Sequence, residues 1–160
     1  MTKKQVYDKL CTKDYHEVAR LEPATFAISA LMNTKDSISY WLESAKDDWK
    51  VAKHLFEKRD YSYSLFLGLL TIEKILKAIY VDRLRDAPPF THRLMHLAEM
   101  AAIELTDRQI ELLETITDFN LEARYPDEKF SFKKKCTKSF TENYFKKIEE
   151  MRKCLLKLIQ

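Results

Sequence analysis

The segment around Arg124 and Tyr125 places a cation beside an aromatic ring just before Pro126. A guanidinium binds phosphate through two nitrogens while an aromatic ring stacks on a base, so this pair is typical of a phosphate and nucleotide contact. The same arginine also fits the role of the cation that the carboxyl end of a helix attracts. The residues alone leave both interpretations open.

A second group of charges, Glu73, Lys74 and Lys77, follows the strongly apolar run of residues 63–72. Charges in such a place are either paired or part of a site. Glu73 and Lys77 are four residues apart with the acid first, which is the favourable order for an ion pair on one helix face. The sequence therefore predicts a Glu73 to Lys77 pair on the rim of a helix, with a binding site as the alternative.

His92, His96 and Glu99 are spaced so that all three can face one way on a helix. The HExxH zinc signature is absent, because Arg93 stands where it needs a glutamate. A histidine pair at this spacing is more often an ordinary surface or capping feature, so no metal site is predicted.

Basic residues are concentrated near the C-terminus, where residues 133–160 hold nine basic and three acidic side chains, although the whole chain carries only +3. The densest part is Lys133, Lys134, Lys135 and Lys138. We favour a solvated entry to the last helix, and contact with nucleic-acid phosphates is the alternative.

Glycine content excludes several classes of enzyme. The chain has one glycine, Gly68, whereas average usage of about 7% would give roughly eleven in 160 residues. Phosphate-binding loops, dinucleotide-binding turns and nucleophile elbows each need several glycines at fixed spacing. No cofactor is therefore implied, and nothing in the chain resembles a nucleophile paired with a base.

The three cysteines form no CxxC pair, and their odd number favours reduced thiols over disulfides. No uncharged stretch approaches the roughly 18 apolar residues that a membrane-spanning helix needs, and no signal peptide fits the charged N-terminus. We expect a cytoplasmic protein without a membrane segment.

Abundant Leu, Lys, Glu and Ala with only four prolines favour an all-α fold. Apolar periodicity predicts an up-and-down bundle of four to five antiparallel helices over residues 36–160, preceded by a partly helical N-terminal extension over residues 1–35. Gly68 indicates a close helix contact, and residues 126–135 are expected to be irregular. The five expected helices begin, in order, after Asp36 or Ser37, after Asp60, after Thr91, after Thr106, and at a capping box of Ser139 and Glu142. The second helix is expected to end near Arg85 and the fourth near Tyr125.

Three stretches within about residues 37–158 resemble the HEPN domain family. Residues 40–80 (YWLESAKDDWKVAKHLFEKRDYSYSLFLGLLTIEKILKAIY) look like the first two helices of the family, with its EK-x-LKA pattern. Residues 88–97 (PPFTHRLMHL) look like its P-x-T-H-x-L loop and third helix, and residues 120–130 (NLEARYPDEKF) look like the A-R-Y-P-D segment after its fourth helix.

The resemblance implies a helical bundle that is usually dimeric and often encoded beside a small nucleotidyltransferase. Many relatives are metal-independent ribonuclease toxins, whose signature is an arginine followed after four to six residues by a histidine. Arg124 matches the arginine, but the following YPDEKFSFKKK contains no histidine, which puts ribonuclease activity in doubt. Arg85 and His92 have the right spacing by coincidence, ahead of the third helix.

We therefore predict a non-catalytic homodimeric module that binds a nucleotide or a nucleotidyltransferase, with a toxin-antitoxin type system as one setting for it. Its predicted polar groove is bordered by Glu73, Lys74, Lys77, His92, Arg124 and Tyr125. The alternatives are an endoribonuclease in which Arg124 stabilises phosphate charge and His92 transfers the proton, and an RNA-binding protein that uses the lysines of residues 133–138.

Overall fold

The computed structural model describes residues 33–159, and these residues contain helices and no strand. The helices are α4 (Thr34–Glu57), α5 (Tyr61–Leu84), α6 (Leu94–Met100), α7 (Asp107–Arg124), α8 (Ser131–Lys135) and α9 (Lys138–Leu156). The predicted all-α helical bundle is confirmed. Of the predicted N-terminal extension over residues 1–35, residues 1–32 lie outside the described residues, and Thr34 and Lys35 already belong to α4.

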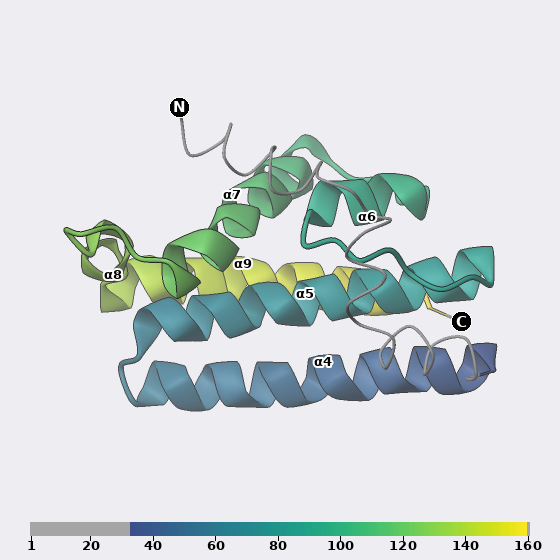
Figure 1. Cartoon of the computed structure of the whole chain (residues 1–160), viewed down its shortest axis with the longest axis horizontal. Helices are drawn as coiled ribbons and strands as arrows, with labels where there is room; N and C mark the ends of the chain where they lie inside the picture. Colours follow the sequence, from purple (N-terminus) through teal and green to yellow (C-terminus); the bar gives the residue numbers. More distant parts are fainter. Residues whose placement is uncertain (1–32, 160) are drawn as a thin grey trace. The chain divides into compact units, whose positions relative to one another are not determined.

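Helix α5 is the centre of the bundle, as its sequence predicts. It is apolar on most sides, and 15 of its 24 residues are buried. It packs along α4 and also contacts α6, α7 and α9, and Figure 1 shows α4, α5 and α9 running side by side. The candidate site residues Glu73, Lys74 and Lys77 therefore lie on the helix against which most of the bundle packs.

Gly68 marks the close approach of α5 to α9. A Cβ atom on Gly68 would lie 3.1 Å from Ile148 Cδ1 and 3.9 Å from the Trp49 ring. The Trp49 ring in turn stacks on Phe145 of α9, with 5.0 Å between the ring centroids. The close helix contact predicted at Gly68 is confirmed.

Several predicted helix starts are wrong by a few residues. Helix α4 begins at Thr34, so Asp36 and Ser37 lie inside its first turn. Helix α6 begins at Leu94 and not after Thr91, because the Thr91 hydroxyl accepts a hydrogen bond from the Arg93 backbone within the loop. Ser, Thr and Asp satisfy backbone groups in turns as readily as at caps, so the first such residue is not always the cap.

The last helix also begins earlier than predicted. Thr137 is the N-cap of α9 and accepts from the Phe140 backbone nitrogen at 3.2 Å, so Ser139 is a helical residue. Thr106, by contrast, caps α7 as predicted, and the Gln109 side chain completes a capping box. The bounds of α5 and the end of α7 before Pro126 also agree with the prediction.

The stretch expected to be irregular contains the short helix α8. Its Phe132 is buried against Phe119 of α7, with 5.1 Å between ring centroids, and this contact gives the segment an apolar anchor. Helix α8 contacts α5 and α7 near the end of the bundle where α5 begins (Figure 1).

At the other end of α5, Arg83 ties the C-terminal end of α6 to α5. Its Nη1 donates to the carbonyl oxygens of Ala101 and Ala102, both at 2.8 Å. As expected, the segment between α5 and α6, which contains Pro88 and Pro89, is not helical. No described helix combines the length and apolar character that a membrane crossing needs.

Candidate functional site

Glu73 is the centre of a buried polar cluster on α5. The residue is only 4% exposed, and each carboxylate oxygen has a separate partner. Oε1 accepts from Lys77 Nζ at 2.8 Å, and Oε2 lies 2.9 Å from His92 Nδ1. The predicted Glu73 to Lys77 pair is confirmed, but it is buried and not on a rim.

The charge state of Glu73 follows from these contacts. Burial raises the pKa of Glu73, but the His92 hydrogen bond and the Lys77 charge act in the opposite direction, and the resulting pKa lies below the ordinary glutamate value. An ionised carboxylate only accepts hydrogen bonds, so His92 Nδ1 must carry the proton and donate it. The half-exposed imidazole therefore has Nε2 available for another group.

Lys77 is enclosed as well as paired. It is 8% exposed, and its Nζ lies 5.0 Å from the centroid of the Trp41 ring on α4. This cation-π contact and the Glu73 carboxylate together replace the water that a buried ammonium loses. We refer to Glu73, Lys77 and His92 as the buried triad.

Lys74 points to a different partner. Its Nζ lies 2.6 Å from Oδ2 of Asp48, so it links α5 to α4. Although Lys74 was predicted to border the same groove as Glu73, the structure pairs it with α4 and not with the buried triad.

Arg124 lies at the C-terminal end of α7 and is exposed. Its Nε donates to the carbonyl oxygen of Asn120 at 3.1 Å, one helical turn earlier. Its Cζ lies 5.7 Å from the centroid of the Phe66 ring and 5.5 Å from that of Tyr125. Tyr125 is 68% exposed. We refer to Arg124, Tyr125 and Phe66 as the arginine stack.

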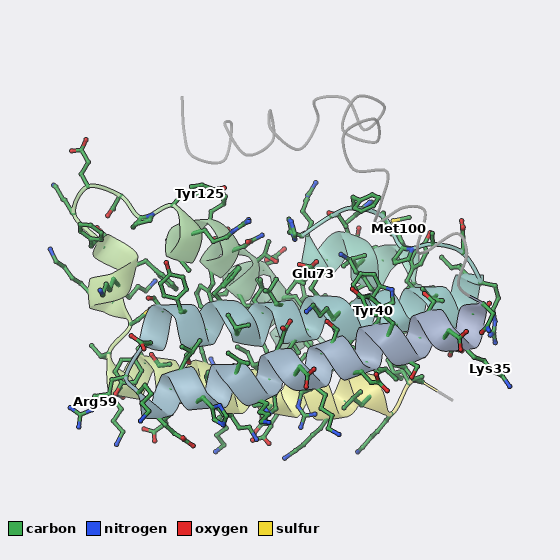
Figure 2. The ribbon with its side chains drawn as sticks, turned by 60° about the horizontal axis from the view of Figure 1, so that its bottom comes forward. Lys35, Tyr40, Arg59, Glu73, Met100 and Tyr125 are labelled. Carbon is green, nitrogen blue, oxygen red and sulfur yellow. The ribbon has the colours of Figure 1, made fainter. Side chains whose placement is uncertain are left out.

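The buried triad and the arginine stack share one side of α5. Phe66 and Glu73 are seven residues apart, which is two helical turns, so they face the same way about 10 Å apart along the helix axis. Figure 2 shows Glu73 between Tyr125, which lies toward the α8 end, and Met100, which lies toward the other end. We refer to this side of α5, from Phe66 through Leu70 to Glu73, as the α5 face.

A hollow that the sequence does not indicate lies between α7 and α9. It has a volume of about 600 Å³, and none of the predicted groove residues lines it. Its lining residues are Thr106, Arg108, Gln109, Glu111, Leu112, Thr115, Tyr144, Lys147, Glu150, Met151 and Cys154.

His96 and Glu99 are exposed on α6. Within residues 33–159 there is no group of three His, Cys, Asp or Glu residues arranged to hold a metal ion.

Cys136 and Cys154 are both free thiols. Burial, with a smaller effect from Glu122, raises the pKa of Cys136 to about 12.

The predicted basic segment is solvent-facing. Lys133, Lys134 and Lys135 are exposed on α8, and Lys138 is exposed in the first turn of α9. Lys135 Nζ lies 5.3 Å from the centroid of the Phe140 ring. Three of the four lysines therefore have no aromatic contact in the described part of the chain.

Sequence reasoning missed Phe66, Trp41 and Asn120. Phe66 and Trp41 belong to apolar stripes, where a core role is the expected one. Asn120 is the exception, because a polar residue at a core position of α7, beside Phe119 and Ile116, breaks the apolar pattern and was a visible signal.

Comparison with known proteins agrees with this fold. The family model described as the HEPN domain matches residues 38–158. The crystal structure of TT1696 from Thermus thermophilus is similar, with a TM-score of 0.67 and 17% identity, over 80% of this chain and 100% of that one. A search of the curated proteins finds no match. Since the family match spans three quarters of the sequence, the chain belongs to the HEPN domain family.

Proposed function

We propose that this protein is a non-catalytic HEPN module that forms a homodimer and binds a nucleotide through the α5 face. The observation that carries the proposal is the arginine stack. The Arg124 guanidinium is exposed, and its two terminal nitrogens donate to none of the described residues. A phosphate group would take both of these nitrogens, and Tyr125 and Phe66 offer ring faces next to it.

The buried triad supplies the fixed end of this face. Both oxygens of Glu73 have partners and the residue is buried, so Glu73 holds Lys77 and His92 in place and does not itself face a ligand. His92 Nε2 is the group of the triad that would meet a ligand bound along the α5 face.

Homodimer formation is supported by the aromatic surface around the arginine stack. Tyr63, one turn before Phe66 on α5, is 52% exposed, and Tyr125 is 68% exposed. Exposed aromatic side chains of this size are enriched at interfaces between chains. Sedimentation equilibrium of the full chain would test this part of the proposal, and a monomer at high concentration would contradict it.

The partner in this proposal is a small nucleotidyltransferase, with a toxin-antitoxin type system as the setting. The resemblance to HEPN proteins supports this partnership, and the absence of a histidine between Arg124 and Lys135 supports the non-catalytic role, since a module without this residue lacks the ribonuclease signature. Copurification of the two tagged proteins tests the partnership, and failure of a co-expressed nucleotidyltransferase to copurify would contradict it.

Isothermal titration with ATP, GTP, CTP and UTP tests the nucleotide site. Arg124→Ala is expected to weaken binding of the preferred nucleotide about tenfold or more, because a charge-assisted contact to phosphate is lost. Arg108→Ala is the matched control, since Arg108 is an exposed arginine at the opposite end of α7. Equal affinity of the two variants would contradict the site, and no binding by the parent protein would contradict the function.

One contact favours ribonuclease activity as a second candidate function. His92 donates from Nδ1 to a buried carboxylate, which is how an imidazole is oriented for proton transfer at Nε2. Within one chain, however, His92 contacts Glu73 and Arg124 contacts Phe66. These two α5 residues are about two helical turns apart. A folded RNA incubated with EDTA tests this candidate, and cleavage that His92→Ala and Arg124→Ala both abolish would favour it over the non-catalytic module.

RNA binding through Lys133, Lys134, Lys135 and Lys138 is the third candidate, and the exposure of all four side chains supports it. Such binding rests on phosphate contacts, so affinity for single-stranded RNA should fall about 10- to 100-fold between about 50 and 200 mM salt. Salt-independent binding would contradict it.

A further inference from the structure

His92 has one ring nitrogen that the fold holds and one that it does not. Nδ1 lies 2.9 Å from Oε2 of the buried Glu73, while 51% of the His92 side chain is exposed. The two nitrogens of an imidazole point in different directions, so the contact of Nδ1 leaves Nε2 outside it. Within residues 33–159, Nε2 has no hydrogen-bond partner. The exposed part of the ring therefore has a polar atom that is available to a ligand.

The contact with Glu73 also decides which hydrogen bonds Nε2 can make. Oε1 of Glu73 accepts from Lys77 Nζ at 2.8 Å, and the ionised carboxylate can only accept, so the proton of a neutral His92 ring is on Nδ1. Nε2 then carries a lone pair and no proton. It takes a hydrogen bond from an N–H or O–H group, and it has nothing to offer to a carbonyl or phosphate oxygen.

The α5 face places this acceptor some way from the cation of the arginine stack. Arg124 contacts the ring of Phe66 at one end of the face. His92 contacts Glu73 at the other end, about 10 Å further along the helix axis. The half-buried Leu70 lies between them on the same side of α5. A nucleotide has the same order of groups, with phosphate at one end and a flat base with a polar edge at the other, so a phosphate at Arg124 directs the base toward His92.

We propose that His92 Nε2 accepts a hydrogen bond from the exocyclic amino group of the base, so that the α5 face selects adenine or cytosine nucleotides. This inference rests on the proposed nucleotide binding and names the ligand class of that site. Adenine has an amino group at N6 and cytosine has one at N4, whereas the pyrimidine without an amino group has a carbonyl oxygen at O4. Such an oxygen beside Nε2 brings two acceptors together with no proton between them. Arg124 binds the phosphates of any nucleotide, so the preference among bases comes from His92.

Two pairs of nucleotides that differ by one amino group test the assignment on the parent protein. ATP is compared with purine riboside triphosphate, and CTP with the triphosphate of pyrimidin-2-one riboside. Each analogue has hydrogen in place of the amino group, so the natural nucleotide should bind about threefold to tenfold more tightly, as expected for one hydrogen bond. Isothermal titration at about pH 8.5 favours the imidazole with a single proton. Equal affinities within the pair that binds, or tightest binding of UTP, would overturn the inference.

His92→Phe shows whether this residue is responsible for the preference. Phenylalanine keeps a ring but has no acceptor, so the preferred nucleotide and its analogue without the amino group should bind equally. Affinity for inorganic triphosphate, which has no base, should not change. His96→Phe is the matched control, because His96 is an exposed histidine four residues further along the chain, and it should keep the preference of the parent. A preference that persists in His92→Phe, with the fold verified by circular dichroism, contradicts the assignment.

A second measurement needs no variant at position 92. The chain has four histidines, His16, His54, His92 and His96, so ¹⁵N-histidine labelling gives four pairs of ring nitrogen signals. His16→Gln, His54→Gln and His96→Gln identify the His92 pair by elimination. The free protein at about pH 8.5 should show a proton on Nδ1 and none on Nε2. The Nε2 signal should shift with the preferred nucleotide and stay in place with inorganic triphosphate. A proton on Nε2, or an unshifted signal at saturating nucleotide, rejects the proposed contact.

The failures of the two proposals differ. If the parent protein binds no nucleotide, the proposed function fails and this inference fails with it. If the parent binds a nucleotide and its analogue without the amino group equally, and Arg124→Ala loses both, the nucleotide site stands and the role of His92 alone is rejected.

Discussion

The two ends of the α5 face differ in how their polar groups are satisfied. In the buried triad, both Glu73 oxygens have partners and Lys77 is also covered by the Trp41 ring. In the arginine stack, the exposed Arg124 side chain bonds the Asn120 backbone carbonyl, and the buried Asn120 side-chain amide has no hydrogen-bond partner among the described residues. Removing one member of a satisfied buried cluster leaves its partner unpaired and is costly, whereas an amide that is already unpaired has no partner to lose.

The largest expected effect on stability is at Glu73. Glu73→Gln leaves Lys77 buried without its counter-charge, and breaking a buried ion pair in this way costs about 3–5 kcal/mol. Urea unfolding at neutral pH measures the loss. The matched control is Glu149→Gln, since Glu149 and Lys153 have the same four-residue spacing on α9 but are exposed, and such a pair is worth about 0.3–0.5 kcal/mol. Similar losses in both variants would show that the buried triad is no more important than a surface pair.

A double variant sharpens the same comparison. Glu73→Leu with Lys77→Met removes both charges and fills the space with apolar side chains, and replacement of a buried pair in this manner is often neutral or stabilising. The double variant should therefore unfold at a higher urea concentration than Glu73→Gln, although it contains two changes. If it is less stable than Glu73→Gln, the burial of the pair contributes stability beyond charge neutralisation.

The pH dependence of stability should follow the charge of Glu73. The pKa of Glu73 is lower in the folded protein than its ordinary value near 4.3. Its ionised form therefore stabilises the fold above that pH, and this contribution disappears as the pH falls through the lower folded-state value. The difference in unfolding free energy between the parent and Glu73→Gln should narrow between about pH 5 and pH 3, because a protonated glutamate resembles glutamine. A constant difference over this range would contradict the assignment.

Most of the fold could be predicted from the sequence, because helices follow from the spacing of apolar residues and end at prolines, and both signals are local. The all-round apolar character of residues 63–72 predicts a central helix, and the two adjacent prolines predict the break after it. The helix starts were less predictable. Thr91, Thr137 and Ser139 all have hydroxyl groups suited to a cap, and the local loop geometry that selects among them is set by tertiary contacts.

The candidate site was predicted less completely, for a physical reason. The four-residue spacing of Glu73 and Lys77 identifies their pair, because both belong to one helix. The contact of His92 with Glu73 joins residues 19 apart, and that of Arg124 with Phe66 joins α7 to α5. Contacts between separate helices depend on how the helices pack, which spacing along the chain does not contain. Lys74 is another example, since its partner Asp48 lies on another helix and the spacing of residues along the chain does not indicate this pair.

The smallest expected effect on stability is at Arg124. Arg124→Ala removes one hydrogen bond to a backbone carbonyl and two ring contacts at an exposed position, where cation-π contacts are worth about 0.5–1 kcal/mol. The unfolding free energy should therefore fall by about 1–2 kcal/mol, while nucleotide affinity falls about tenfold or more. Glu73→Gln should show the converse, a large loss of stability in a protein that, while folded, still has its arginine stack. If Arg124→Ala destabilises the protein as much as Glu73→Gln does, the arginine stack is part of the structural core and the division of the α5 face into a structural end and a binding end is wrong.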